Sequence, residues 1–351
     1  MNHPDTAISE AAPSPPHAEL AEAGVDDASA GLLLPPCERT TQHPPAPLIH
    51  VATSLVGILG PFVGVIAAMI VSWRRGWLDW TQISILVSGL ILTGLGLTLG
   101  YHRLVTHRAF STYPWVRGFW IILGALGLQK SPLEWCATHR KHHALSDQPG
   151  DPHSPHVDFH EPGFVNTLKG FWHAHVGWIF TGNLLATDQK RYVPDLLQDP
   201  FVMWIHRYWE IGFAPLTFLI PTGVAWAITR TGEGALLGFL WGGCVRVFLV
   251  QHITFSVNSI CHMLGSRDFA SDDHSRNNLI CGLLSAGEGF HNNHHAFPTS
   301  ARHGLSWREP DLTWAVIRLM ELTGLAWDVK LPTEQQQLKK RLPPPGRKIA
   351  R

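Results

Sequence analysis

Four long apolar runs constrain the fold of this chain more than any other feature of its sequence. Residues 48–73 and 83–101 contain no Asp, Glu, Lys or Arg, and each supplies roughly the 20 residues with which an α-helix crosses a bilayer. Residues 211–228 and 235–257 form a second pair, and the short segment between them is typical of a helical hairpin. Since only helices and closed barrels satisfy the backbone in lipid, we predict an all-α integral membrane protein with four transmembrane helices.

Charged residues in and beside the runs predict how the chain is oriented. The region from residue 102 to residue 209 and the region after residue 262 are rich in Arg and Lys, which places both in the cytoplasm by the positive-inside rule. With four spans, both termini are then also cytoplasmic. Arg74, Arg75 and Arg230 fall on the opposite side and do not follow the rule.

The fourth run contains one ionisable side chain, Arg246. Such a residue within a span faces the protein interior or water, or its head reaches the membrane interface, and the sequence leaves these alternatives open.

The segments outside the runs differ in composition. Residues 1–47 are rich in Pro, Ala and Glu and predict a disordered tail without the features of a secretory signal. Residues 48–330 contain all four runs and predict one membrane domain with a cytoplasmic helical cap. Residues 331–351 predict a basic, proline-broken and unstructured C-terminal tail. Residues 115–128 are apolar but too short to span, and we expect them at the interface or against the cap.

Histidines recur in three short blocks beside these runs, namely His102 with His107, then His139, His142 and His143, and finally His291, His294 and His295. Neutral imidazole is the commonest protein ligand for transition metals. In the second and third blocks the spacing i, i+3, i+4 places the rings on one helix face, as metal ligation requires. In the first block the spacing i, i+5 separates the rings by about 140° on a straight α-helix. We therefore expect a helix end between these two histidines.

Composition and motifs exclude several classes of function. Basic and acidic residues number 27 each, which gives no electrostatic case for nucleic-acid binding. The five cysteines form no CxxC pair, and the HExxH motif of zinc hydrolases is absent. Glu288 and His291 match the Glu-x-x-His motif of soluble di-iron proteins only once. Eight clustered imidazoles, with His262 as a candidate ninth, fit two non-haem iron ions.

These motifs resemble those of the membrane fatty-acid desaturase family, particularly its stearoyl-CoA (Δ9) desaturase branch, of bacterial type. The resemblance extends from about residue 50 to residue 325 and rests on GYHRLVTHR (100–108), EWCATHRKHH (134–143), DPH (151–153), HVGW (175–178), NSICH (258–262) and GEGFHNNHHAFP (287–298). It implies an O2-dependent oxidoreductase that introduces a cis double bond, near Δ9, into a saturated acyl chain. It also implies two iron ions held by nine histidines and, through water, by one asparagine. The matching positions are His102, His107, His139, His142, His143, His262, His291, His294, His295 and Asn258.

The resemblance further implies residues that bind the acyl chain. Gln129, Trp135 and Thr254 would shape the bend of the acyl tunnel, with packing at the membrane surface as their alternative role. If the acyl tail lies along the second run, Gly94 and Leu90 are expected to set chain length, because they repeat the i, i+4 spacing below the first histidine block. Helix packing is the alternative account of Gly94. The histidines expected outside the metal shell are His153, His156, His160, His173 and His175.

Three departures from the animal acyl-CoA branch concern the acyl carrier. Ala137 and the pair Gly182-Asn183 stand where that branch has basic residues, so charges expected to hold a CoA phosphate are missing. Phe255 replaces a tryptophan and keeps an aromatic wall. These changes favour an acyl-lipid or a carrier-bound acyl chain over free acyl-CoA as the substrate.

The sequence also predicts partners and leaves two rival functions open. No haem-binding motif or cysteine cluster is fused to the chain, so we expect a ferredoxin-like donor and its reductase, at a bacterial inner membrane. A fatty acyl hydroxylase on the same scaffold would use the same ligands. A histidine-rich membrane metal transporter would carry its histidines within the spans, whereas here they gather at the span ends.

Overall fold

The computed structural model describes residues 48–76, 79–159, 161–181 and 186–343. Within these residues the helices are joined by loops, and the one sheet is a ladder of two short strands, β1 (Ser111–Thr112) and β2 (Ala326–Trp327), which pair antiparallel with Ser111 opposite Trp327. The predicted all-α fold is confirmed, and the predicted N-terminal tail, residues 1–47, lies outside the described residues.

Four helical segments are long and apolar enough to cross a membrane, as the sequence predicted. The first is α1 (Leu48–Arg75), and each of the other three joins α-helix to a π-helical stretch. The second span is α2 (Trp80–Leu95) with η1 (Gly96–Thr106); the third is α7 (Pro200–Tyr208), η4 (Trp209–Phe213) and α8 (Ala214–Thr229); the fourth is α9 (Gly232–Leu237), η5 (Gly238–Val245) and α10 (Arg246–Met263). All three are longer at both ends than the apolar runs, because helical hydrogen bonding continues into polar sequence.

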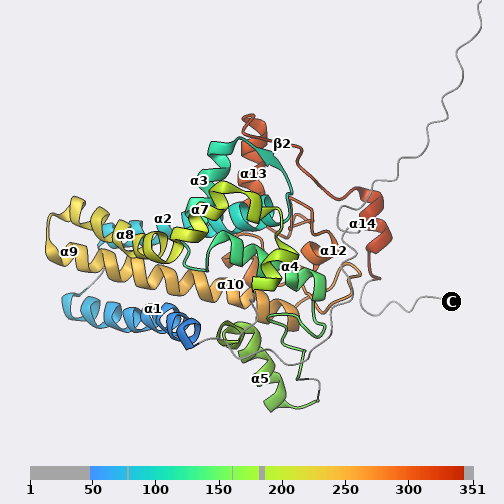
Figure 1. Ribbon diagram of the computed structural model, residues 1–351, viewed down its shortest axis with the longest axis horizontal. Coiled ribbons are helices and arrows are strands. Elements are labelled where there is room, and N and C mark those ends of the chain that lie inside the picture. The colour runs from blue at the N-terminus through green and yellow to red at the C-terminus, as the bar shows by residue number, and fades with distance from the viewer. Residues whose placement is uncertain (1–47, 77–78, 160, 182–185, 344–351) are drawn as a thin grey trace, which may run out of the picture. The chain divides into compact units, whose positions relative to one another are not determined.

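Shorter helices form a cap around the histidine-bearing ends of the spans. In chain order they are α3 (Pro114–Ala125), α4 (Pro132–Leu145), α5 (Phe164–His175), η2 (Gly177–Phe180), α6 (Ala186–Tyr192), η3 (Leu196–Gln198), α11 (Leu279–Leu284), α12 (His291–Ala296), α13 (Leu312–Leu322) and α14 (Glu334–Lys340). Figure 1 shows α8 and α1 on either side of the fourth span, with α4 and α12 near one end of α10. Helix α3 packs against η1, as expected for the short apolar stretch.

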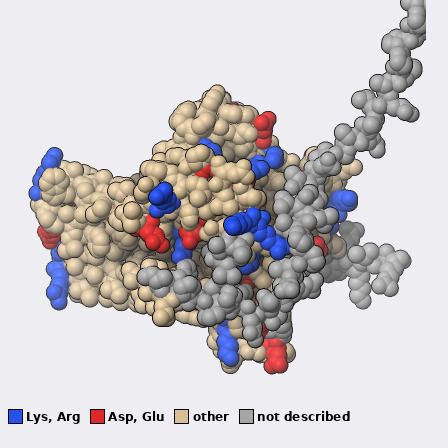
Figure 2. Space-filling view, viewed as in Figure 1, with Lys and Arg blue, Asp and Glu red and all other residues tan. Residues whose placement is uncertain are grey.

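Charged side chains are sparse on the surface formed by the spans. Figure 2 shows Lys, Arg, Asp and Glu gathered at one end and over the cap, with a broad band between them that carries almost none. Large apolar side chains are exposed there, including Leu59 and Val63 on α1 and Leu219 and Ile228 on α8. An apolar band of this kind is stable in lipid rather than in water, so the chain is a membrane protein.

A proline interrupts the first span, and a buried side chain of the fourth span compensates for it. Pro61 in α1 has no N–H to donate to the carbonyl of Gly57, four residues earlier. Gln251 of α10 donates its Nε2 to that carbonyl at 3.1 Å and to the carbonyl of Leu128 at 3.2 Å. In lipid, such a neighbour is the condition under which a proline is tolerated inside a span.

Arg246 has the same role for the third span. Pro221 in α8 leaves the carbonyl of Thr217 without its helical donor, and Arg246 donates to that carbonyl at 2.9 Å. Its guanidinium also donates to the carbonyls of Gly242 and Leu126 and to the hydroxyl of Thr93. Arg246 therefore faces the protein interior, where it connects three spans, and does not reach the membrane interface.

The C-terminal segment is helical where the sequence predicted an unstructured tail. Helix α14 begins with a capping box formed by Thr333 and Gln336. Beyond it, the backbone N–H of Leu342 donates to the carbonyl of Asp268 at 2.9 Å, and Lys340 Nζ donates to the carbonyl of Ala296 at 2.8 Å. These tertiary bonds attach the segment to the cap, and residues 344–351 lie outside the described residues.

Candidate metal centre

The first histidine block lies at the end of the second span, where the helix is wider. In η1, as in any π-helix, backbone N–H groups bond to carbonyls five residues earlier, and the N–H of His107 donates to the carbonyl of His102 at 3.1 Å. This turn brings the two ring centroids to 4.8 Å. The helix ends at Thr106, between the two histidines as expected, but it is the π geometry of its last turn that places these i, i+5 neighbours on the same side.

Helix α4 carries the second block and is fixed at its start. Pro132 occupies its first turn, and Ser131 and Glu134 form a capping box. The hydroxyl of Ser131 also lies 2.7 Å from Nδ1 of His206, which attaches α4 to α7. The third block forms α12, and His262 stands in the last turn of α10.

The nine predicted histidines converge in two groups. The five-histidine cluster contains His102, His107, His139, His143 and His294, and the four-histidine cluster contains His142, His262, His291 and His295. Both α4 and α12 contribute to both clusters. In each of these helices the i, i+4 pair enters one cluster and the remaining histidine enters the other. One helix face therefore serves two adjacent groups, a division that the spacing alone does not indicate.

The distances between ring nitrogens fit a metal ion with ligands at right angles. In the five-histidine cluster, His143 Nε2 lies 2.8 Å from His294 Nε2 and 3.0 Å from His139 Nε2. In the four-histidine cluster, His262 and His291 have their Nε2 atoms 3.1 Å apart. Two ligands at about 2.1 Å from an ion are about 3.0 Å apart at right angles and about 3.4 Å apart in a tetrahedron. Rings at these spacings can face one ion, and the five histidines of the larger cluster exceed the four ligands of a tetrahedral site.

Aspartates hold three rings of the four-histidine cluster from behind. His142 Nδ1 lies 2.9 Å from Asp151, His262 Nδ1 lies 2.9 Å from Asp147, and His295 Nδ1 lies 2.6 Å from Asp273. A hydrogen bond from Nδ1 fixes the tautomer and leaves Nε2 free to bind a metal. The Nε2 atoms of His142 and His295 are buried without a hydrogen-bond partner among the described residues, which is the condition expected of metal ligands.

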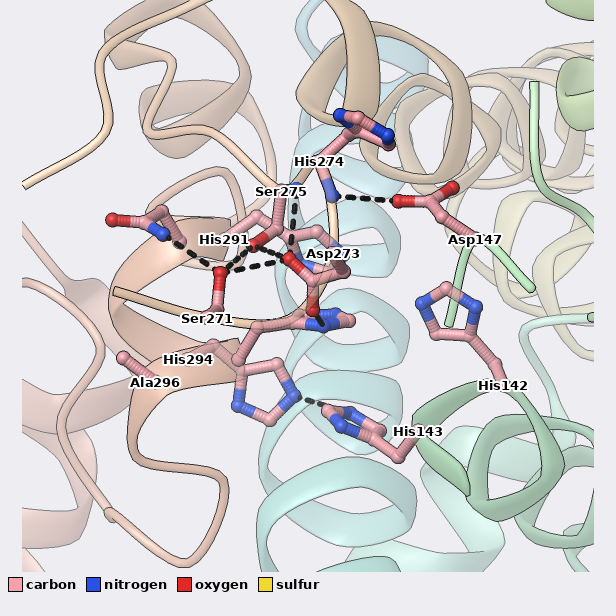
Figure 3. Close-up of polar contacts among 12 residues, drawn as sticks. His142, His143, Asp147, Ser271, Asp273, His274, Ser275, His291, His294 and Ala296 are labelled. Carbon is pink, nitrogen blue, oxygen red and sulfur yellow. Dashed lines mark hydrogen bonds and ion pairs between the residues drawn. The ribbon is translucent and has the colours of Figure 1, made fainter. Parts of the chain in front are cut away.

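The loop that contains Asp273 is itself held by hydrogen bonds. Figure 3 shows Ser271 and Ser275 directed at the Asp273 carboxylate, and both hydroxyls and the backbone N–H of Ser275 donate to it. The backbone N–H of His274 donates to Asp147 at 2.8 Å. One loop thus links two of the supporting carboxylates, Asp147 and Asp273. The two histidines that these carboxylates contact are therefore held in fixed positions relative to each other.

Burial keeps six of the candidate ligand histidines neutral. Burial, and then repulsion from neighbouring imidazoles, lowers the pKa of six rings well below the ordinary 6.5, namely His107, His139, His142, His143, His291 and His294. An imidazole must be unprotonated to coordinate a metal. These six rings meet that condition at neutral pH.

A cavity of about 990 Å³ adjoins the five-histidine cluster. His139 and Asn258 line it, and so do the predicted tunnel residues Gln129, Trp135 and Thr254. Gln129 donates to the hydroxyl of Thr254 at 2.8 Å. The Trp135 ring stacks on His139 with centroids 5.0 Å apart. The remaining wall is mostly apolar and comes from α1, α8, η5 and α10.

Gly94 and Leu90 do not line this cavity. The expectation that they set chain length assumed that the acyl tail lies along the second span, whereas the cavity runs along α1 and the fourth span. Leu90 instead packs against the hydrophobic core.

Of the histidines that we expected outside the metal shell, His153 forms a further possible metal-binding group with His142 and Asp151. His153 packs on His142 at 4.2 Å between centroids and lines the cavity. His156 Nε2 contacts the carbonyl of His262 at 2.9 Å. His175 lies 3.0 Å from both His252 and Ser259, away from the clusters. His160 lies outside the described residues.

Comparison with known proteins identifies the family of this chain. A model of the fatty acid desaturase family matches residues 75–327, which include both clusters. The chain belongs to the fatty acid desaturase family. It is therefore an oxidoreductase that acts on acyl chains, and its histidine clusters are groups that could hold metal ions.

Relatives of this desaturase act on different acyl carriers. A hex-5-enoyl-(acyl-carrier protein) acetylenase of Moorena producens is 39% identical over 284 residues, 80% of this chain and 87% of the relative. An sn-1 stearoyl-lipid 9-desaturase of Anabaena variabilis is 37% identical over 279 residues, 79% of this chain and 93% of the relative. An icosanoyl-CoA 5-desaturase of Limnanthes douglasii is 36% identical over 274 residues, 76% of this chain and 68% of the relative.

Sequence reasoning missed a buried ionic network beneath the five-histidine cluster of the desaturase. Glu288 forms ion pairs with Nδ1 of His102 and with Arg103, and lies 3.3 Å from Nδ1 of His303. Arg103 also pairs with Asp311 at 2.9 Å. Burying the charges of an arginine and two carboxylates costs free energy unless each charge is paired. Because the pairs here join the second span to the third histidine block, the network favours one arrangement of the two. The Glu-x-x-His match at Glu288 was the only signal in the sequence.

Proposed function

We propose that this desaturase binds two iron ions, one in each histidine cluster, with Asn258 as an additional ligand through water. The observation that supports the proposal is the pair of all-histidine clusters beside an apolar cavity. Nitrogen ligands without thiolates, five of them in one cluster, suit non-haem iron better than tetrahedral zinc.

Iron bound there would supply the reduction of O2. The overall reaction takes two hydrogens from adjacent methylenes, and these, with two electrons and two protons, convert O2 to two waters. A ferredoxin-like donor and its reductase would deliver the electrons. The donor would approach from the cytoplasm, where the cap, the site and both termini lie in the proposed topology.

The residues around His139 would place the acyl chain. Trp135 stacks on His139, so it fixes that ring and forms a wall next to the reacting carbons. Gln129 is tied to Thr254 and to the carbonyl of Val250 at 3.1 Å. A polar pair held this firmly in an apolar channel would impose a bend, and a bent chain has the shape of a cis product. We propose Δ9 as the position, after the stearoyl-lipid 9-desaturase relative.

We propose an acyl-lipid as the substrate. Among the described residues that line the cavity, Lys130 is the one basic side chain, and the acidic Glu210 lines it as well. A CoA headgroup carries several phosphates and requires more positive charge than one lysine. Ala137 cannot contribute to this argument, because it is fully buried in the core, and Gly182 and Asn183 lie outside the described residues.

Expression in a host without this activity, followed by mass spectrometry of each lipid class, tests the function. We expect a new cis double bond in membrane lipids and iron in the purified protein. Hydroxylated chains in place of the alkene would favour the hydroxylase. An unchanged lipid profile with metal export would favour a transporter.

The carrier is tested separately by reconstitution with ferredoxin, reductase and O2. We expect phospholipid-bound chains to react faster than free acyl-CoA. Faster turnover of acyl-CoA would contradict the acyl-lipid proposal and would direct attention to Lys130 as a phosphate contact.

A further inference from the structure

Part of the cavity wall is bare backbone of α1. Gly57 and Gly60 line the cavity, and a Cβ built on either would meet no atom within 4 Å. Gly64 also lines it, but a Cβ there would lie 2.3 Å from Cβ of Cys244. Helix α1 therefore leaves space at the first two glycines and packs closely against the fourth span at the third.

The glycines lie at increasing depth from the histidines. The carbonyl of Gly57 accepts a hydrogen bond from Gln251, and Gly64 lies against Cys244. Residue numbers thus rise along α1 as they fall along the fourth span, so the two helices run antiparallel. Asn258, at the histidine end, is seven residues from Gln251, or about 10 Å along the helix. Gly60 is about 4.5 Å deeper than Gly57.

Buried polar atoms mark the same level of the cavity. Gln251 is 3% exposed and Ser54 is 6% exposed, and both line the cavity. Oε1 of Gln251 and Oγ of Ser54 have no hydrogen-bond partner among the described residues. Both oxygens are shielded from solvent, so the chain packs closely around Gln251 and Ser54, and the open part of the wall at this level lies at the glycines.

We propose that the wall at Gly57 and Gly60 sets the length of acyl chain that the enzyme accepts beyond the reacting carbons. The inference rests on the proposed function, in which this cavity holds the acyl tail. Because both glycines line the cavity and have open space around a Cβ, a side chain at either would add volume at the cavity wall without displacing its neighbours, and that volume is needed by a long tail.

The test compares Gly57→Leu and Gly60→Leu with Gly94→Leu as the matched control. A Cβ on Gly94 also meets no atom within 4 Å, but Gly94 does not line the cavity. Each variant is expressed in a host fed a mixture of saturated fatty acids of graded length, and the products are resolved by chain length.

We expect the ratio of long to short products to fall at least about tenfold for Gly57→Leu, because a pocket discriminates by roughly that factor for each methylene it excludes. Gly60→Leu should remove only the longest chains, since it lies deeper. Gly94→Leu should keep the wild-type profile. Unchanged profiles for both α1 variants, or a shift with Gly94→Leu, would overturn the inference.

Iron content and membrane abundance are measured for every variant. If a leucine variant is inactive on acyl chains of every length, Gly57→Ala is tested in its place. It should shift the chain-length profile of the products in the same direction, and an unchanged profile would overturn the inference. A different result would contradict the proposed function, namely that the wild-type enzyme forms no double bond in any lipid.

Discussion

The two histidine clusters differ in how they are held and in what they border. In the four-histidine cluster, three rings are backed by aspartates, and His142, His262 and His291 are almost completely buried. In the five-histidine cluster, Glu288 contacts His102, and this is the carboxylate contact found among the described residues. Three rings of this cluster are partly exposed. One of these, His139, lines the cavity. The difference suggests a rigid site that depends on its supports and an accessible site that meets the substrate.

The largest effect is expected from removing ligands of the accessible cluster. His143→Ala and His294→Ala should each reduce product below detection and lower iron content, while membrane insertion persists because the spans are unchanged. Iron analysis and product quantification check this, with His173→Ala as a control outside both clusters. Near-normal turnover in either variant would remove that histidine from the centre.

A smaller loss should follow when the supports of the rigid cluster are weakened. Asp273→Asn keeps the size of the side chain but loses the charge that orients His295, and we expect metal affinity or activity to fall about 10–100-fold. Metal content of the purified protein should approach half. Asp272→Asn, its exposed neighbour, serves as the control and should bind like the wild type. Equal behaviour of the two variants would show that the carboxylate does not support the metal.

A chelator should remove metal from the two clusters at different rates. The partly exposed rings next to the cavity should release their metal first, and the buried cluster should release its metal more slowly, giving two phases of metal loss. Activity should disappear with the first phase. A single phase would contradict the distinction between an accessible and a rigid site.

The smallest effect is expected from Trp135→Phe. Phenylalanine keeps a ring against His139, and an aromatic contact is worth about 0.5–1.5 kcal/mol, so turnover should fall less than roughly tenfold. Metal content should stay at the wild-type level, while the position or geometry of the double bond changes slightly. Loss of metal instead would make Trp135 a structural support of the cluster.

Sequence patterns were sufficient for features that depend on local order. The four spans follow from long apolar runs, and the three histidine blocks together with His262 identify the residues that converge. The division of α4 and α12 between two clusters was not predictable, because it depends on how His142 and His294 meet helices far away in the sequence.

Other features required the third dimension. The helix end in the i, i+5 block lies where the sequence predicted it, but the π-helical turn that aligns the two rings was not predicted, because nothing in the local sequence indicates a π-helix. The supporting Asp147, Asp151 and Asp273 stand in loops whose spacing has no period. Gly94 and Leu90 were chosen on the assumption that the tail follows the second span, and only the packing of α1 against the fourth span shows where the cavity lies.

The two prolines inside spans bear on the order in which the protein is assembled in its membrane. Until α10 arrives, α1 and α8 each hold a carbonyl in hydrocarbon without a donor, at a cost of about 1–3 kcal/mol apiece. Gln251 and Arg246 remove both penalties at once. The last span to be synthesised is therefore the one that completes the earlier ones, and the membrane domain matures only after its final helix has been inserted. Quality control that recognises exposed polar backbone in the bilayer would detect every chain that stops short of that step.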